Sequence, residues 1–239
     1  MKRIWLMVIK NITVIPFFYL KLCYYAWNSR KVTEEKKLAL FKEIVARANR
    51  GGNVTVRSYG MEHIPKNESF VYIPNHQGLY DVLAILSGTP CFFSVVMKKE
   101  LEHIPFLSKI FQIMGACSMD REDVRQAMKV ILKVSQEVSS GKNFLIFPEG
   151  TRSRKKNIVG DFKGGSFKCA TKAKCPIVPV AIVDSYKVFD QNSIKNVTVT
   201  VQYLEPLYYE DYKMMKTNEI AELVEEKIKT AVKKIEKSS

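Results

Sequence analysis

Residues 70–81, Phe-Val-Tyr-Ile-Pro-Asn-His-Gln-Gly-Leu-Tyr-Asp, join an apolar run to a polar bend. The run 70–73 shows no polar alternation, which is typical of a strand buried on both faces. On a straight helix His76 and Asp81 would lie about 140° apart around the axis, because each residue turns by about 100°. We therefore expect the two side chains to meet across a bend, with His76 at the end of the strand and Asp81 in the first turn of a helix.

On both sides of this segment, β-rich runs alternate with stretches of helical periodicity. Strands are expected at 54–59, 70–73, 91–97, 144–147, 176–183 and 197–203. Helices are expected at 32–50, ended by Gly51 and Gly52, and at 121–139 and 217–236. The apolar stripe of the second helix is expected to contain Val124, Met128, Ile131, Leu132, Ser135 and Val138. This alternation predicts an α/β fold with a mixed, largely buried sheet flanked by helices.

The first thirty residues are apolar and aromatic, but Lys10 and Lys21 interrupt them. The uncharged runs 11–20 and 22–29 are short, whereas a spanning helix needs about 20 mostly apolar residues. The segment also carries several aromatic residues, namely Trp5, Phe17, Phe18, Tyr19, Tyr24, Tyr25 and Trp27. Aromatic rings interleaved with basic residues favour helices that lie in the membrane interface. A span over residues 4–27 and a buried core helix are the alternatives.

The chain is strongly basic. It has 239 residues, with 38 Lys and Arg against 24 Asp and Glu, and a formal net charge of +14. Such an excess attracts nucleic acid, an anionic membrane surface or acidic substrates. No zinc-finger spacing, basic-region heptad or aromatic RNA-binding strand is present, so we expect no nucleic-acid partner.

The five cysteines are scattered, and no two of them form a Cys-x-x-Cys pair. This pattern indicates neither a disulfide framework nor a zinc site, and we expect reduced, structural thiols on the cytoplasmic side of the membrane. The histidines are His63, His76 and His103, and none belongs to a His-Glu-x-x-His motif. We therefore expect no catalytic metal.

A second polar motif, Phe-Pro-Glu-Gly-Thr-Arg-Ser, occupies residues 147–153. It places a glycine, which permits a tight turn, beside the guanidinium of Arg152. A planar guanidinium can bind two oxygens of a phosphate or carboxylate, so this motif suits an anionic substrate. His76 supplies a base and Asp81 a carboxylate to orient it, and together the motifs favour an enzyme over a scaffold.

These motifs resemble the conserved blocks of glycerolipid acyltransferases of the 1-acylglycerol-3-phosphate type. The blocks occur in the family's order as His76-x4-Asp81, then residues 115–121 with Arg121, then residues 149–152, then Ile-Val-Pro-Val-Ala-Ile at 177–182. Residues 98–101 and 104–106 are similar to the segment between the first two blocks. The resemblance spans about residues 54–205. It departs at Gly78, where many members carry serine, so the hydrogen bonding of this bend is open.

The resemblance implies an acyltransferase that needs no cofactor and moves a fatty acyl group from acyl-CoA or acyl-carrier protein to the sn-2 hydroxyl of lysophosphatidic acid. His76 would be the base and Asp81 its orienting carboxylate, since the substrate's own hydroxyl is the nucleophile. The expected substrate-binding residues are Lys98, Arg121, Glu149, Gly150 and Arg152. Arg121 and Arg152 would hold the phosphate, with Lys98 adding charge, while Glu149 would orient Arg152 or contact the glycerol.

The composition and the helical spacing also predict a domain organisation. We expect membrane-associated helices and a linker helix over residues 1–50, a catalytic domain over 51–239, and a monotopic or peripheral protein on the cytoplasmic face. The apolar set in residues 104–111 either lines an acyl tunnel or packs in the core. The alternative functions are acylation of another acceptor, such as glycerol 3-phosphate or another lysophospholipid, and a non-catalytic basic protein that binds membrane lipid.

Overall fold

The computed structural model describes residues 2–120 and 123–238, which contain one seven-stranded sheet. The strands are β1 (Val54–Tyr59), β2 (Val71–Pro74), β3 (Ser94–Lys98), β4 (Cys117–Met119), β5 (Phe144–Leu145), β6 (Ile177–Val183) and β7 (Val197–Tyr203). Their order in the sheet is β1-β7-β6-β2-β5-β3-β4. Every neighbouring pair is parallel except β6 and β7, which are antiparallel. The predicted mixed, buried sheet is confirmed.

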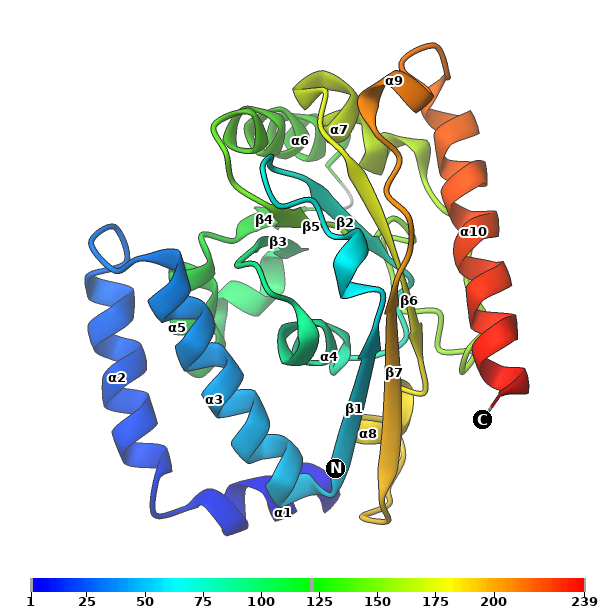
Figure 1. Cartoon of the computed structure of the whole chain (residues 1–239). Helices are drawn as coiled ribbons and strands as arrows, with labels where there is room; N and C mark the ends of the chain where they lie inside the picture. Colours follow the sequence, from blue (N-terminus) through cyan, green and yellow to red (C-terminus); the bar gives the residue numbers. More distant parts are fainter. Residues whose placement is uncertain (1, 121–122, 239) are drawn as a thin grey trace.

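Helices cover both faces of this sheet (Figure 1). They are α1 (Lys2–Asn11), α2 (Ile15–Trp27), α3 (Glu34–Gly52), α4 (Asp81–Gly88), α5 (Pro105–Met114), α6 (Val124–Ser139), α7 (Lys168–Ala173), α8 (Tyr186–Phe189), α9 (Tyr209–Tyr212) and α10 (Thr217–Lys237). Three short 3-10 helices are η1 (Met61–His63), η2 (Lys99–His103) and η3 (Gly164–Phe167). The alternating helices and strands thus form the predicted α/β fold.

Strand β6 shows how the sheet divides the core in two. All its residues are buried, and they alternate between the two faces. Val178, Val180 and Ile182 join the apolar cluster under α1–α5, whereas Ile177, Ala181 and Val183 join the cluster under α6, α7 and α10. A strand buried on both faces has no polar alternation, which explains the continuous apolar run in the sequence.

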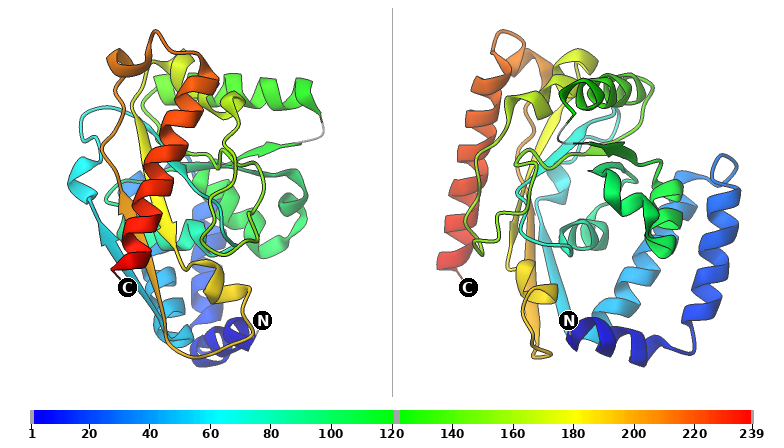
Figure 2. Two further views of the ribbon diagram at one scale, coloured as in Figure 1. Left: turned by 90° about the vertical axis from the view of Figure 1, so that its right-hand side faces the viewer. Right: turned by 180° about the vertical axis from the view of Figure 1, so that it is seen from behind.

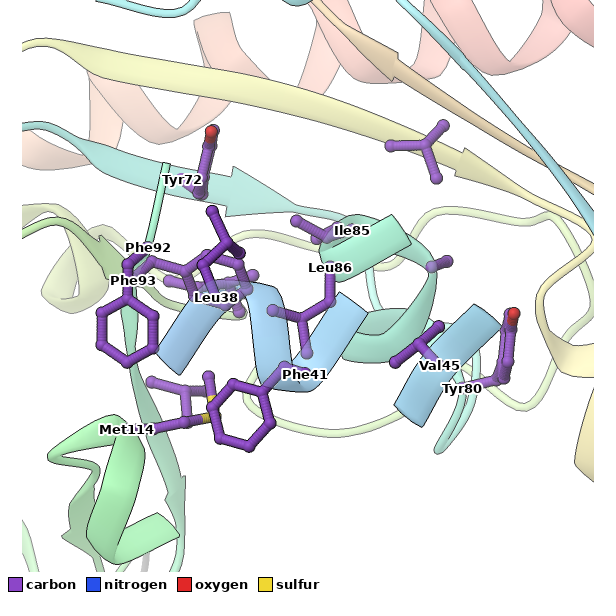
Figure 3. Packing of buried hydrophobic residues seen from close by; sticks show 14 of the residues in the cluster. Leu38, Phe41, Val45, Tyr72, Tyr80, Ile85, Leu86, Phe92, Phe93 and Met114 are labelled. Atoms are coloured by element: carbon purple, nitrogen blue, oxygen red, sulfur yellow. The ribbon is translucent and has the colours of Figure 1, made fainter. Parts of the chain in front are cut away.

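Several aromatic side chains contact one another in the first of these clusters. Tyr72 of β2 meets Phe93 edge to face at 5.7 Å, and Phe41 of α3 stacks on Phe92 with the ring centroids 6.3 Å apart. Figure 3 shows these rings around α3, together with Leu38, Val45, Ile85, Leu86 and Met114. The linker helix α3 is therefore part of the same core as β2, from which the bend with His76 emerges.

Gly51 and Gly52 do not end α3, as the sequence suggested, but lie in its last turn. A β-carbon on Gly51 would be 2.7 Å from Asn11 Nδ2, and one on Gly52 would be 2.2 Å from Met7 Cε. The two glycines therefore permit close packing of α1 against α3. The helix ends instead at Asn53, whose φ of 55° is left-handed.

The structure also differs from the sequence-based expectations in two strands and one helix. β3 begins at Ser94 and not at residue 91, and the short strand β4, which has three residues, was not predicted. In α6 the buried face contains Val130, Ile131, Val134, Ser135 and Val138. Val124, Met128 and Leu132 are exposed, because the packed face is rotated toward residues 130 and 134.

The N-terminal segment forms two helices. α1 packs against α3, and α2 packs against α5 at the edge of the molecule, away from α10 (Figure 2). Among the described residues, no single helix is long and apolar enough to cross a membrane. α1 and α2 reach that composition only as a pair, and the pair is bent by 92° at the break.

Candidate active site

The bend that follows β2 is fixed to the end of β6 by amide side chains. Asn75 is buried and exchanges two hydrogen bonds with the main chain of Ile182, at 3.0 Å and 2.8 Å. Gln77, also buried, donates to the Ile182 carbonyl at 2.9 Å. These bonds satisfy the polar groups of the bend and hold it between two central strands.

His76 and Asp81 meet across this bend, and Asp81 begins α4. His76 Nδ1 lies 2.7 Å from Asp81 Oδ2, which also accepts from the main-chain amides of Gln77 at 2.7 Å and Gly78 at 3.1 Å. An oxygen surrounded by amide donors accepts from the imidazole, so Nδ1 carries the proton. The His76 ring stacks on Phe147 at 3.9 Å. Its Nε2 has no hydrogen-bond partner among the described residues, so it is free to accept a proton.

The carboxylate of Glu149 holds the main chain of the same bend. Oε1 accepts from the amide of His76 at 2.7 Å, and Oε2 accepts from that of Gly160 at 3.2 Å. Burial raises the pKa of Glu149 to about 7, although both amide hydrogen bonds oppose this change. The Glu149 carboxylate thus binds the main chain of His76 and Gly160 and not Arg152.

Beside the bend lies a cavity of about 330 Å³, lined by Arg152, Arg154, Lys156, Tyr186 and Asp190. The amide of Ser153 donates to the His76 carbonyl at 2.9 Å, which fixes the basic loop next to the bend. Gly150 permits the preceding turn with a φ of 72°. Arg152 Nη1 lies 3.6 Å from Asp190 Oδ1. The cavity offers three cationic side chains to an anionic group.

Sequence reasoning found Arg152 in this cavity but not the other lining residues. Arg154 and Lys156 both have left-handed backbones, at φ of 52° and 59°, for which the sequence carries no signal. Tyr186 and Asp190 come from the α8 region, where no strong motif marks them. Only the density of basic residues in 152–156 could have suggested a larger cationic site.

The other expected site residues lie elsewhere. Lys98, at the end of β3, forms an ion pair with Glu100 at 2.7 Å and does not line the cavity. Arg121 lies outside the described residues. In the 104–111 segment, Ile110 and Phe111 pack on the core, whereas Ile104 and Phe106 are exposed. Phe111 also lines a second cavity of about 320 Å³ with Met97, Glu102, Ser108, Gln112, Gly115 and Ala116.

Comparison with known proteins connects this geometry to a family. The family model described as Acyltransferase matches residues 55–183, more than half of the chain. A 1-acyl-sn-glycerol-3-phosphate acyltransferase of Borreliella burgdorferi is 33% identical over 152 residues, covering 62% of this chain and 59% of the relative. Enzymes of the same name from Saccharomyces cerevisiae and Escherichia coli are 30% and 31% identical, covering 75% and 63% of this chain. The chain spans 60% and 62% of those two relatives.

A solved structure shares the whole fold. It is the crystal structure of the 1-acyl-sn-glycerophosphate acyltransferase PlsC from Thermotoga maritima, which superposes with a TM-score of 0.76 and 22% identity. The alignment covers 98% of this chain and 97% of the other. The matched family region contains both the bend with His76 and Asp81 and the loop with Glu149 and Arg152. The chain belongs to the acyltransferase family.

Proposed function

We propose that this protein transfers a fatty acyl group from acyl-CoA or acyl-carrier protein to the sn-2 hydroxyl of 1-acylglycerol 3-phosphate, giving phosphatidic acid. The observation that carries the proposal is the oriented pair of His76 and Asp81, 2.7 Å apart, beside a cavity with three cationic side chains. The names of the relatives support the same acceptor.

The chemistry follows from the free nitrogen of His76. An alcohol is a poor nucleophile until its proton is being removed, so Nε2 takes the proton as the hydroxyl oxygen attacks the thioester carbonyl. Asp81 stabilises the imidazolium that forms and fixes the tautomer through Nδ1. The carbon–sulfur bond then breaks, and the thiolate takes the proton from His76. The ester is formed and the imidazole is neutral again.

The cationic cavity would bind the phosphate of the acceptor. Arg152 presents a planar guanidinium that matches two phosphate oxygens, and Arg154 and Lys156 add charge. Asp190 Oδ1 lies 3.6 Å from Arg152 Nη1, so a bound phosphate would compete with Asp190 for this guanidinium. Lys98 and Arg121 remain proposed contributors, and Glu149 would act by holding the main chain of His76, with Gly150 forming the turn between them.

We also propose that residues 1–50 hold the catalytic domain, residues 51–239, on the cytoplasmic face of an anionic membrane. Trp5 and Trp27 are 67% and 89% exposed, and Phe17 and Leu20 are also exposed on α2. Exposed aromatic and aliphatic residues of this kind suit the headgroup region. Each nearby Lys or Arg adds about 1 kcal/mol toward an anionic leaflet. A lipid acceptor and a water-soluble donor could then both reach His76.

The catalytic proposal is tested by measuring thiol release from acyl-CoA, and deacylation of acyl-carrier protein, with and without acceptor. Lysophosphatidic acid should give acceptor-dependent release and phosphatidic acid, and His76→Ala should lower kcat by about 10²- to 10⁴-fold. His103→Ala is the matched control, since His103 is an exposed histidine outside the cavity. If glycerol 3-phosphate or lysophosphatidylcholine is turned over faster than lysophosphatidic acid, that compound replaces lysophosphatidic acid as the proposed acceptor. No turnover of any acceptor would favour a non-catalytic lipid-binding protein.

The membrane proposal needs a change that leaves the core intact. Trp5→Ser combined with Trp27→Ser removes exposed apolar surface and leaves the buried residues of α1 and α2 unchanged. This variant should float less with vesicles that contain phosphatidylglycerol and lose activity on vesicle-borne acceptor, but keep activity on a short-chain soluble acceptor. Met214→Ser, at a residue that is 90% exposed outside the segment, is the control. Unchanged flotation of the double variant would place the membrane contact elsewhere.

A further inference from the structure

The turn between β6 and α8 supplies a hydroxyl to the carboxylate of Asp81. Ser185 is fully buried, and its Oγ donates to Asp81 Oδ1. His76 Nδ1 and the amides of Gln77 and Gly78 all contact the other oxygen, Oδ2. Among the described residues, Ser185 is therefore the one whose hydroxyl donates a hydrogen bond to Oδ1. Both oxygens of this fully buried carboxylate are held.

The turn itself is fixed by two amide side chains. The amide of Ser185 donates to Gln77 Oε1 at 3.0 Å, and that of Asp184 donates to Asn157 Oδ1 at 2.9 Å. Asp184 has a φ of 67°, a conformation that is costly for a residue other than glycine and persists only where the surroundings enforce it. The surroundings of this turn therefore place the Ser185 hydroxyl in one position.

Gly78 brings the turn close to the bend. A β-carbon at this position would lie 3.3 Å from the Cα of Tyr186, tighter than ordinary contact. With glycine, the start of α8 can pack directly on the bend, and Ser185 reaches Asp81 from a distant part of the sequence. The hydroxyl partner that the bend sequence lacks is supplied by residue 185.

We infer that Ser185 is a positioning residue for acyl transfer, acting through Asp81 on His76. The inference rests on the proposed function, because it assigns Ser185 a part in the same reaction. The carboxylate of Asp81 can rotate about its Cβ–Cγ bond. A hydrogen bond from Ser185 to Oδ1 fixes the plane of the carboxylate so that Oδ2 faces His76 Nδ1. Loss of the hydroxyl leaves a buried charged oxygen without its donor, which favours other orientations of the carboxylate.

Ser185→Ala should lower kcat by about 5- to 100-fold, as expected for an unsatisfied buried acceptor, and leave the KM for lysophosphatidic acid within about twofold. Ser185→Cys replaces the hydroxyl by a thiol, which is only a weak donor, and should lower kcat to a similar extent. This variant tests the inference if Ser185→Ala does not fold. Ser94→Ala is the control. Ser94 is buried and donates to the Met114 carbonyl at 2.6 Å, but it lies at the opposite end of the strands. Parent kcat in both Ser185 variants would overturn the inference.

A double-mutant cycle tests whether Ser185 acts through Asp81. In the Asp81→Asn background, Ser185→Ala should cost less than about twofold, since the residue it positions is already lost. An equal loss in both backgrounds would overturn the inference. The downfield proton resonance of His76 Nδ1–H gives a readout that needs no substrate. It should be present in the parent and in Ser94→Ala, and weakened in Ser185→Ala. If the resonance weakens in Ser185→Ala but the parent acylates no acceptor, the proposed reaction is wrong and the positioning by Ser185 is supported. If the resonance is unchanged in Ser185→Ala, only the positioning is refuted.

Discussion

Replacing Arg3 by alanine should destabilise the protein by about 3 kcal/mol and loosen α1 from α3 and α8. Arg3 is 1% exposed, although it lies in the N-terminal segment that the sequence assigns to the membrane interface. Its guanidinium donates to the carbonyls of Val188 at 3.0 Å and Lys195 at 2.9 Å, and to that of Gly52. A fourth contact, to Asn53, is longer at 3.4 Å. One side chain therefore joins α1, the end of α3, α8 and the loop before β7.

The magnitude follows from these bonds. A buried intramolecular hydrogen bond contributes about 1 kcal/mol net, so the three bonds to Val188, Lys195 and Gly52 give about 3 kcal/mol. The long contact to Asn53 adds little. For a chain of this size, 1 kcal/mol corresponds to about 2–4 °C in Tm, so the expected decrease is about 6–12 °C. Arg3→Lys should lie between the parent and Arg3→Ala, because an ammonium group cannot span all three carbonyls.

Thermal unfolding in detergent, followed by circular dichroism, measures this effect. Lys2→Ala is the matched control, since it removes the same charge from an exposed position in the same helix. We expect its Tm to stay within about 2 °C of the parent. If Arg3→Ala also stays within that range, the guanidinium does not hold α1 in place, and other contacts attach the segment, such as the packing of Met7 and the hydrogen bond from Asn11 to the Arg47 carbonyl.

Three further predictions concern the site. Asp81→Asn should lower kcat by about 10²- to 10⁴-fold, because an amide cannot hold the imidazole tautomer, and parent rates would show that the two side chains do not act together. Arg152→Ala should raise the KM for lysophosphatidic acid by about 10- to 100-fold with little change for acyl-CoA, whereas Lys98→Ala should change it less. Burial raises the pKa of Glu149 from its ordinary 4.5 to about 7, so the stability that its protonated form contributes is complete below about 4.5 and is lost as the pH rises through about 7. The Tm of Glu149→Gln relative to the parent should therefore increase across this window, and a pH-independent difference would contradict the burial of the charge.

The sequence predicted those parts of the fold that depend on local pattern. The apolar run of β6 and the helical period of α10 are visible within one window, and the bend from His76 to Asp81 follows from their spacing. Other features depend on long-range packing. Arg3 contacts a carbonyl 185 residues away, and Ser185 contacts a carboxylate 104 residues away. An isolated arginine or serine has no periodicity, so no local pattern distinguishes these two from residues on the surface.

Helix α8 has a consequence for how the protein can change during evolution. Its Val188 carbonyl binds Arg3 of the N-terminal helix, Asp190 just after it pairs with Arg152, and Ser185 just before it contacts Asp81. A single short helix therefore supports the N-terminal segment, the cationic cavity and the pair of His76 and Asp81. If the proposed function holds, we expect a substitution that shifts α1 to change turnover and acceptor affinity as well. Because Arg3 binds main-chain carbonyls, which every residue carries, residues 1–30 of a close homologue should be accepted only when they keep an arginine at this position.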